Sequence, residues 1–236
     1  MNDISEQAYR LIKKNKKQII NQFIPESAST NKRPIFMFMA GAPGAGKTEF
    51  SKNLIKILTK KIVVNGMIRI DADEIRELFR DIGYNGKNSD LFKRGCIKGV
   101  EILYDRCLKK KYHTVLDGTL SFVNIARRNI DAALKVGAKV FIVYVYQDPV
   151  IAWGFSQIRE QKEGRRIEKA FFVKSLFDSI KNVNMLKQEY GNKIEVWLVE
   201  KNFAHNVENI KYNVDNIDSY LKIAYNSDTL INILYE

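Results

Sequence analysis

The sequence predicts an α/β fold, in which helices cover both faces of a mainly parallel β-sheet. Three observations lead to this prediction. Short apolar runs of strand type alternate with longer segments of helical periodicity. The first run, IFMFMA, is apolar throughout, as expected for a strand buried on both faces. Glycine-rich or acidic motifs directly follow several of the runs, where open parallel sheets place their sites.

The predicted elements follow in a regular order. Apolar residues at helical spacing predict an opening helix over 4–23, which Pro25 and the polar stretch 26–33 end. Further helices are predicted to begin after residue 70 and to span 47–58, 89–110, 125–135, 149–162 and 170–190. Strands are predicted over 35–40, 63–70, 113–116, 139–146 and 194–199. The final part is rich in Asn and Asp, and a polar connection with a terminal helix around 217–225 is expected.

The 236 residues are predicted to form a single domain. Residues 34–200 would be its core, residues 1–33 an N-terminal helix and connection, and residues 201–236 a C-terminal extension. Hydrophobic residues make up 45% of the chain, which excludes disorder as the dominant state. The apolar runs are far shorter than the roughly 18 residues of a membrane span, and the N-terminus lacks a hydrophobic signal core. We therefore expect a cytoplasmic protein without a membrane partner.

The balance of 39 Lys+Arg against 27 Asp+Glu gives a net charge of +12. A basic chain can bind nucleic acid, a phosphorylated substrate or an acidic protein. The positive residues are scattered in short runs rather than gathered in a basic tail, so nucleic acid is an unlikely partner.

The cysteines and histidines predict neither a disulfide nor a metal site. Cys96 and Cys107 lie 11 residues apart in one predicted helix, about 16 Å along its axis, which is too far for a disulfide. The chain has no Cys-x-x-Cys or Cys/His cluster. His113 and His205 stand alone, and each is expected to be structural or solvated.

A phosphate-binding loop follows the first strand. The motif G-x-x-x-x-G-K-[ST] is matched in full by Gly41, Ala42, Pro43, Gly44, Ala45, Gly46, Lys47 and Thr48. Its glycines let the backbone close around phosphate oxygens, and the next helix directs its free N–H groups at the same anion. Lys47 is expected to contact the β- and γ-phosphates of ATP, and Thr48 to bind Mg²⁺. The motif predicts a nucleoside triphosphate-binding protein with the three-layer P-loop NTPase fold.

Acidic residues follow the next two strands. Asp71 and Asp73 end one strand and begin a helix, so either can cap that helix or accept a proton from a substrate hydroxyl. Asp117 precedes Gly118 at the end of the following strand, where it can lie near the metal or simply form a turn.

Arginines gather late in the chain, around the end of the helix predicted over 149–162. Arg159, Arg165 and Arg166 can neutralise charge on a transferred phosphoryl group, or they can lie on a solvated face. No Asn-Lys-x-Asp motif follows a strand, which argues against a GTPase. Separate acids and a lid of arginines are typical of small-molecule kinases.

Together these motifs resemble the zeta toxin family. The resemblance rests on GAPGAGKT, IDADEIR, a long helix containing Glu101, VLDGTL and the separated arginines, and it extends from about Ile35 to Val199. Zeta toxins are P-loop kinases of bacterial toxin–antitoxin systems, related to chloramphenicol phosphotransferase. The resemblance implies an ATP- and Mg²⁺-dependent kinase that phosphorylates the 3′-hydroxyl of the amino sugar in UDP-N-acetylglucosamine. It also implies an antitoxin that blocks the ATP site.

The resemblance also assigns roles to single residues. The catalytic base falls on Asp73, and the groups that stabilise the transferred phosphoryl fall on Lys47, Arg159 and Arg165, with Arg166 as the alternative ATP-binding lid arginine. The residues implied to bind the substrate, besides Asp73, are Glu101, Asp117 and Thr119.

Two departures from the family pattern affect the acceptor site. Asp117 stands where the family has Glu, and Ser121 where it often has an arginine that holds the anionic nucleotide. A hydroxyl cannot replace a bidentate guanidinium. Phosphorylation of another acceptor, such as NAD, an antibiotic or an RNA end, therefore stays open, as does a non-enzymatic nucleotide-dependent module. Arg127 or Arg128 can reach the region that the family arginine would occupy.

Overall fold

The described strands form one six-stranded sheet of order β2-β3-β1-β4-β5-β6, in which only β6 is antiparallel to its neighbour. The computed structural model describes residues 2–60, 66–202, 204, 206–221 and 225–235. The strands are β1 (Ile35–Ala40), β2 (Ile68–Asp71), β3 (Thr114–Asp117), β4 (Lys139–Tyr146), β5 (Ile194–Lys201) and β6 (Val207–Lys211). The predicted α/β class with a mainly parallel sheet is confirmed.

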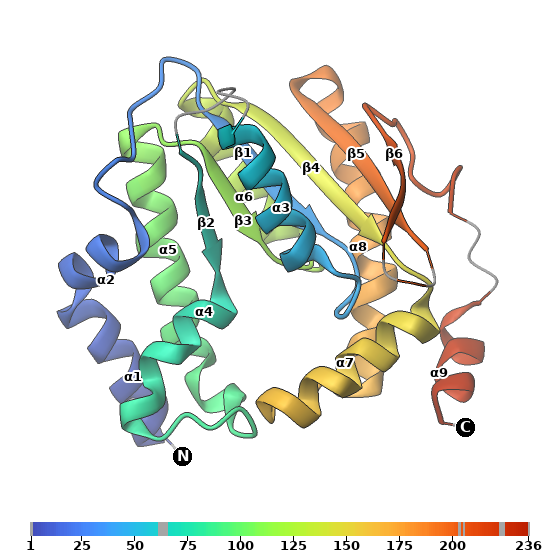
Figure 1. Ribbon diagram of the computed structural model, residues 1–236, viewed down its shortest axis with the longest axis horizontal. Coiled ribbons are helices and arrows are strands. Elements are labelled where there is room, and N and C mark those ends of the chain that lie inside the picture. Colours follow the sequence, from blue (N-terminus) through green and yellow to red (C-terminus); the bar gives the residue numbers. More distant parts are fainter. Residues whose placement is uncertain (1, 61–65, 203, 205, 222–224, 236) are drawn as a thin grey trace.

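The helices lie on both faces of this sheet (Figure 1). The α-helices are α1 (Asn2–Lys14), α2 (Lys16–Phe23), α3 (Lys47–Lys60), α4 (Ala72–Arg76), α5 (Lys93–Lys110), α6 (Val123–Lys135), α7 (Pro149–Glu163), α8 (Lys169–Tyr190) and α9 (Ser227–Tyr235). Short 3₁₀ turns are η1 (Glu77–Ile82), η2 (Ser89–Phe92) and η3 (Gly191–Lys193).

The alternation of side chains along β1 divides the core in two. Phe36 and Phe38 belong to the larger apolar cluster, which also takes in buried residues of α5, α6 and α8. Met37 and Met39 belong to a smaller cluster on the opposite face, with Phe50 of α3. Both faces of β1 are therefore covered, which explains why its sequence is apolar at every position.

The register of the parallel strands gathers the predicted motifs at one edge of the sheet. Asp71 at the end of β2 lies directly opposite Asp117 at the end of β3. β3 in turn pairs with β1, whose end leads into the phosphate-binding loop. The acids and the loop, which lie far apart in the sequence, therefore meet at the carboxyl ends of neighbouring strands, as expected for an open parallel sheet.

The predicted N-terminal helix is divided in the structure. Asn15 separates α1 from α2, so the segment forms two helices rather than one over 4–23. α1 packs on α5, with Ala8 and Ile12 fully buried. The contact is close because α5 carries Gly95 and Gly99 where it faces α1 and α4.

Three other element predictions differ from the structure. The helix predicted over 89–110 begins with the 3₁₀ turn η2 and is α-helical only from Lys93. β2 is described from Ile68, and residues 63–65 of the predicted strand lie outside the described residues. The antiparallel strand β6 was not predicted, because its sequence VENIK is polar and its positions are exposed or half-buried.

The terminal helix predicted around 217–225 is wrong over its described part, since residues 217–220 form a bend and a turn. The backbone N–H of Ile217 donates to the side chain of Asn184, and that of Asp218 donates to Asn216. Side-chain oxygens that take backbone N–H groups in this way compete with helix formation. Residues 222–224 lie outside the described residues, and the final helix is α9.

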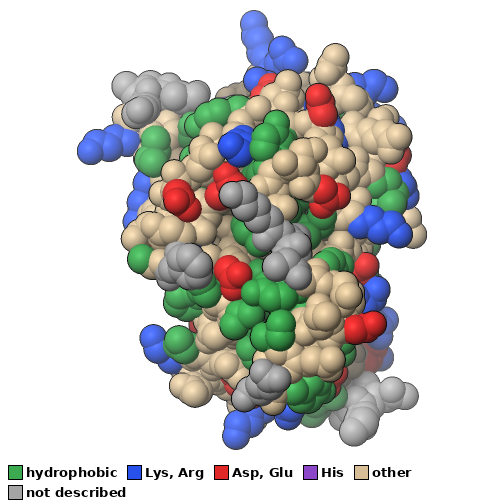
Figure 2. All heavy atoms as spheres, turned by 90° about the vertical axis from the view of Figure 1, so that its right-hand side faces the viewer, with side chains coloured by type: hydrophobic (Ala, Val, Ile, Leu, Met, Phe, Trp, Pro, Cys, Tyr) green, Lys and Arg blue, Asp and Glu red, His purple; other side chains and the backbone are tan. Residues whose placement is uncertain are grey.

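The C-terminal segment packs on the core and also forms part of the surface. Val214, Ile217, Leu230 and Leu234 are buried in the larger apolar cluster. Figure 2 shows the face of the molecule that carries the last elements, where apolar side chains lie among scattered charged ones. The exposed apolar residues of this segment are Val207, Tyr212, Tyr220, Ile233 and Tyr235.

The cysteines and His113 lie in structural positions. Cys96 and Cys107 are buried free thiols on α5, and burial raises the pKa of each to about 11. The Nδ1 atom of His113 accepts a hydrogen bond of 2.9 Å from the backbone N–H of Ile35 at the start of β1. His205 lies outside the described residues.

Within the described part of the chain, no helix has both the length and the apolar character that crossing a bilayer requires.

The glycines of α5 give a prediction about stability. A Cβ at Gly95 would lie 2.7 Å from Cζ of Phe79 and 3.1 Å from the backbone of Ala8. We expect Gly95→Ala to lower the free energy of unfolding by about 1–3 kcal/mol through overpacking, although alanine is the better helix former. Urea denaturation measures the change. Gly154→Ala on α7 is the matched control, because a Cβ there meets nothing within 4 Å. Equal effects of the two substitutions would contradict the close packing of α1 on α5.

Candidate active site

The phosphate-binding loop has the geometry that its glycines allow. Gly41, Gly44 and Gly46 have φ angles of 128°, 75° and 83°, in the region that favours glycine. The loop also lies against neighbouring backbone, since a Cβ on Gly44 would lie 2.0 Å from the carbonyl oxygen of Ala152 on α7. An L-residue with a side chain at this position would therefore disturb both the loop and the start of α7.

Lys47 begins α3, and its ammonium group turns back into the loop. Its Nζ donates to the carbonyl oxygens of Gly41 and Ala42 at 3.0 and 2.6 Å. Burial lowers the pKa of Lys47 to about 8, although the carboxylates of Asp117 and Asp73 act in the opposite direction. The structure thus holds a buried cation at the place where the motif predicts phosphate oxygens.

The two acids after β2 have different partners. Asp71 is the N-cap of α4, and its Oδ1 accepts the backbone N–H of Asp73 at 2.8 Å. Asp73, inside the first turn, directs its carboxylate at arginines instead. The capping role that the sequence left open between the two acids therefore belongs to Asp71.

Three arginines surround Asp73. Arg159 of α7 donates from Nη2 to Oδ2 at 2.6 Å, and Arg165 and Arg76 also pair with the same carboxylate. Burial raises the pKa of Asp73, but the charges of Arg165, Arg159 and Arg76 outweigh it and hold the pKa below its usual value. Asp73 is consequently an ionised carboxylate held in place by cations from two elements and the segment after α7.

The predicted lid is built from α7 and the residues that follow it. Gly164 ends α7 in the left-handed conformation, and Arg165 comes directly after it. Gly86, from the loop after η1, packs so closely here that a Cβ would lie 2.1 Å from the carbonyl oxygen of Glu163. Figure 1 shows α7 running beyond the edge of the sheet, with its C-terminal end beside the loop that follows α4 and η1. Arg166 is exposed, so only Arg165 of the two alternatives reaches Asp73.

Arg69 links the ends of β2 and β3, and the sequence analysis missed it. Its Nη1 lies 2.8 Å from Oδ2 of Asp71 and 2.8 Å from Oδ2 of Asp117, and its other terminal nitrogen pairs with Glu74. Only 8% of its side chain is exposed. The signal was present in the sequence, since a cation inside the short strand IRID has to be paired when the strand is buried.

Asp117 connects this cation to the phosphate-binding loop. Its Oδ2 accepts the hydroxyl of Ser51 at 3.2 Å, and it also accepts a hydrogen bond from the side chain of Thr48. Burial and the neighbouring Asp71 raise the pKa of Asp117 against the opposing charges of Lys47 and Arg69. The structure therefore brings Thr48, Asp117 and Lys47 together, as the motifs predict.

The residues after β3 form a turn beside the loop. The carbonyl oxygen of Thr119 accepts the backbone N–H of Gly41 at 3.3 Å. The hydroxyls of Thr119 and Ser121 are 2.7 Å apart and share a hydrogen bond. Ser121, which replaces the family arginine, thus pairs locally with Thr119.

Glu101 lies on α5, apart from the Asp73 cluster. Its carboxylate pairs with Lys98 at 3.1 Å and with Arg128 of α6 at 3.8 Å. It lines a cavity of about 410 Å³ between α1 and α5. Of the two arginines considered as replacements at Ser121, Arg128 reaches Glu101, whereas Arg127 pairs with Glu189 of α8.

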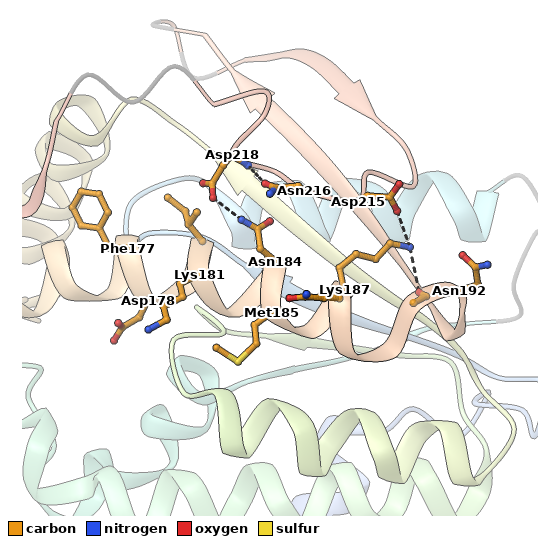
Figure 3. Close-up of a pocket in the computed structure, with 13 residues that line it drawn as sticks. Phe177, Asp178, Lys181, Asn184, Met185, Lys187, Asn192, Asp215, Asn216 and Asp218 are labelled. Atoms are coloured by element: carbon orange, nitrogen blue, oxygen red, sulfur yellow. Dashed lines mark hydrogen bonds and ion pairs between the residues drawn. The ribbon is translucent and has the colours of Figure 1, made fainter.

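A larger cavity of about 930 Å³ lies along α8, away from these residues (Figure 3). Its lining comes from α8, from η3 and from the segment after β6, and it contains none of the site residues predicted from the sequence. Lys187, the buried cation there, bonds to backbone carbonyls and to Asn213, so its role is to join α8 to that segment.

The chain matches the family model described as zeta toxin over residues 20–215. Among solved structures, it is similar to one from the PezAT chromosomal toxin–antitoxin system of Streptococcus pneumoniae, with a TM-score of 0.65 and 18% identity. That match covers 95% of this chain and 85% of the other.

Two further solved structures share the fold. One is the complex of AvrRxo1-ORF1 with ORF2, with a TM-score of 0.65, 13% identity and coverage of 89% of this chain and 70% of the other. The same complex with ATP gives a TM-score of 0.63 at 13% identity, covering 91% and 70%. At these identities the likeness establishes the common fold.

The pairing of Arg69 predicts a pH-dependent effect. Arg69→Met leaves the buried carboxylates of Asp71 and Asp117 without their shared cation, and we expect a loss of about 3 kcal/mol in the free energy of unfolding at pH 7. Burial and Asp71 already raise the pKa of Asp117, and without the opposing charge of Arg69 this pKa rises further above its value in the unfolded chain. The penalty is therefore largest at neutral pH and shrinks as the pH falls and Asp117 takes up a proton.

Denaturation of wild type and variant at pH 7 and pH 5 measures the difference. Arg80→Met is the control, because Arg80 lies on the surface, where it pairs with Glu77 and lies over the ring of Tyr84, and its loss should change the free energy of unfolding little at either pH. A deficit for Arg69→Met that is the same at both pH values would contradict the buried pairing.

Proposed function

The chain belongs to the zeta toxin family, and from this premise we propose that it is an ATP-dependent kinase that phosphorylates a sugar hydroxyl of a nucleotide sugar. The leading acceptor is UDP-N-acetylglucosamine, and the chain would act as the toxin of a toxin–antitoxin system. The observation that carries the proposal is the position of Asp73, a carboxylate held by the lid arginines next to the phosphate-binding loop.

The loop supplies the ATP site. Its backbone N–H groups and the start of α3 offer donors to the phosphates, and Lys47 already lies where the β- and γ-phosphates would bind. Phosphate oxygens can replace the two carbonyl oxygens that now accept hydrogen bonds from Lys47. An anion there would also offset the burial of the ammonium group, which now lowers the pKa of Lys47.

The lid and the base act on the transferred group. Arg159 and Arg165 would turn from Asp73 to the γ-phosphoryl and stabilise its charge in the transition state. Asp73, released from these cations, would accept the proton of the acceptor hydroxyl as that oxygen attacks phosphorus and the bond to ADP breaks. Arg76, three residues along α4, remains beside Asp73 to orient it.

Residues at the start of α3 and at the end of β3 fit a magnesium ion. Thr48 offers a hydroxyl, and the buried carboxylate of Asp117 lies within hydrogen-bond reach of it. The described residues contain no group of three or more His, Cys, Asp or Glu that could hold a metal by themselves. That suits Mg²⁺, which usually binds through one or two protein groups, waters and substrate phosphates. When bound, it would neutralise charge on the phosphate oxygens.

The acceptor would bind between α5 and the turn after β3. Glu101 and Thr119 would contact the acceptor. Asp117 already accepts hydrogen bonds from Arg69 and Ser51, and it would bind the magnesium ion rather than the acceptor. A second candidate is an acceptor other than a nucleotide sugar, such as an antibiotic. It is favoured by Ser121, whose hydroxyl is bonded to Thr119 and cannot hold a nucleotide phosphate as an arginine would.

Transfer to an RNA end is a weaker alternative. It is motivated by the net charge of +12 and by a fold likeness to the Pnkp1/Rnl/Hen1 RNA repair complex, with a TM-score of 0.52 over 68% of this chain. A non-enzymatic nucleotide-dependent module would have no use for Asp73 among the lid arginines. An antitoxin is the proposed protein partner, and the solved toxin–antitoxin relative supports it.

Mass spectrometry of nucleotide sugars incubated with the protein and Mg·ATP tests the proposal. We expect UDP-N-acetylglucosamine to gain one phosphoryl group. Parallel reactions with NAD and with 5′-hydroxyl RNA identify the alternative acceptors. Lys47→Ala should abolish the product, because no cation then holds the β- and γ-phosphates. Product formation at the wild-type rate in this variant would sink the kinase assignment, and no phosphorylated product from any acceptor would favour the non-enzymatic module.

Asp73→Asn separates binding from chemistry. We expect turnover to fall by about 10²-fold or more, since the amide cannot accept the proton. ATP affinity should stay the same or increase slightly, because the lid arginines lose a competing carboxylate. Isothermal titration with ATP and initial rates with the acceptor measure the two effects. A collapse of ATP affinity with unchanged turnover of bound ATP would show that Asp73 is not the base.

A further inference from the structure

The turn between β3 and α6 contains a residue in an unfavourable backbone conformation. Leu120 has a φ of 58°, in the left-handed region. For a residue with a branched side chain, this conformation is disfavoured because Cβ lies too close to the following carbonyl oxygen. Such a residue persists only where its surroundings hold it.

The group that holds it comes from α8. Asn182 is buried, and its side-chain amide Nδ2 donates to the carbonyl oxygen of Leu120 at 3.0 Å. The two residues are 62 positions apart in the chain. A buried amide needs a hydrogen-bond partner, and the carbonyl of the half-buried Leu120 supplies it, so the bond stabilises the turn in its observed conformation.

The turn reaches both halves of the proposed site. On one side, the carbonyl oxygen of Thr119 accepts the backbone N–H of Gly41, the first residue of the phosphate-binding loop. On the other side, the hydroxyl of Thr119 lies 2.7 Å from that of Ser121, and Leu120 is the residue between them. The backbone conformation of Leu120 therefore sets where Ser121 lies relative to Thr119, and Ser121 is the hydrogen-bond partner of the Thr119 hydroxyl.

We propose that Asn182 is a positioning residue, which keeps Leu120 in the left-handed conformation and so orients Thr119 toward the acceptor. This inference rests on the proposed function, in which Thr119 contacts the acceptor. The hydrogen bond of the Asn182 side chain goes to the backbone of the turn, and Asn182 acts through it. Neither the phosphate-binding motif nor the arginine lid involves α8.

Kinetics of the full chain with UDP-N-acetylglucosamine test the role. Asn182→Ala should raise KM for the acceptor about tenfold, as expected for losing one ordering hydrogen bond, while KM for ATP changes less than twofold. A general loss of folding would move both constants together. An unchanged acceptor KM, or equal changes in the two, would overturn the proposal.

Substitutions at Leu120 supply the sharper comparison. Glycine and alanine both remove the leucine side chain, but only glycine adopts a positive φ without penalty. The effect of Asn182→Ala on acceptor KM should therefore be several-fold smaller in the Leu120→Gly background than in the Leu120→Ala background. The same effect in both backgrounds would show that Asn182 does not act through the conformation of Leu120.

A matched control lies two residues further along α8. The amide of Asn184 also bonds to a distant loop, since it donates to Asp218 at 2.7 Å (Figure 3). Its oxygen accepts the backbone N–H of Ile217. That loop lines the cavity along α8 and is not part of the proposed site. Asn184→Ala should leave both KM values unchanged, and an equal rise in acceptor KM would indicate a general effect of loosening α8.

Hydrogen exchange separates this inference from the proposed function. Asn182→Ala should increase amide exchange at Gly41 and at residues 118–122, whereas exchange across α3 stays as in the wild type. This measurement needs no acceptor. If the wild type transfers phosphate to no acceptor, the proposed function fails. Unchanged exchange at residues 118–122 in the variant would by itself overturn the positioning role.

Discussion

The pairing of buried charges at the carboxyl edge of the sheet is the constraint on which the site depends. The register of β2 and β3 places Asp71 opposite Asp117. Two neighbouring carboxylates that are largely buried need a shared cation. Arg69 supplies it from within β2. With these two acids satisfied, Asp71 caps α4, and α4 then presents Asp73 to the arginines of the lid. The positions of α4 and α7 both follow from this arrangement.

Much of the fold could be predicted because its determinants are local. The apolar run of β1, the glycines of the loop and the alternation of strand and helix each follow from residues that are close in sequence. The predictions fail where residues that are distant in the sequence determine the local structure. A helix around 217–225 is compatible with local propensity. However, the side chain of Asn184 on α8 accepts a hydrogen bond from the backbone N–H of Ile217, which favours a turn. β6 pairs with β5 along a polar sequence that carries no strand signal of its own.

The same distinction holds for the site. The loop from Gly41 to Thr48 and the acids after the strands could be located, because sequence motifs and strand ends mark them. The partners could not, since Arg159 and Asp73 are 86 residues apart and Arg69 and Asp117 are 48 apart. The choice between Arg165 and Arg166 depends on how the chain leaves α7 after Gly164. Glu101 could be placed on its helix, but its pairing with Arg128 depends on how α5 and α6 pack.

The environment of Asp73 implies that nucleotide binding and base strength are coupled in the proposed reaction. Two opposing effects act on this carboxylate: burial raises its pKa, and the charges of Arg165, Arg159 and Arg76 lower it more. While the lid arginines stay on Asp73, it is a weak base. Phosphates in the loop compete for the same guanidinium groups, because phosphate and carboxylate both match the bidentate donor pattern of arginine. As the arginines move, burial becomes the dominant effect and the affinity of Asp73 for a proton increases. The base would therefore gain strength only when the phosphoryl donor is in place.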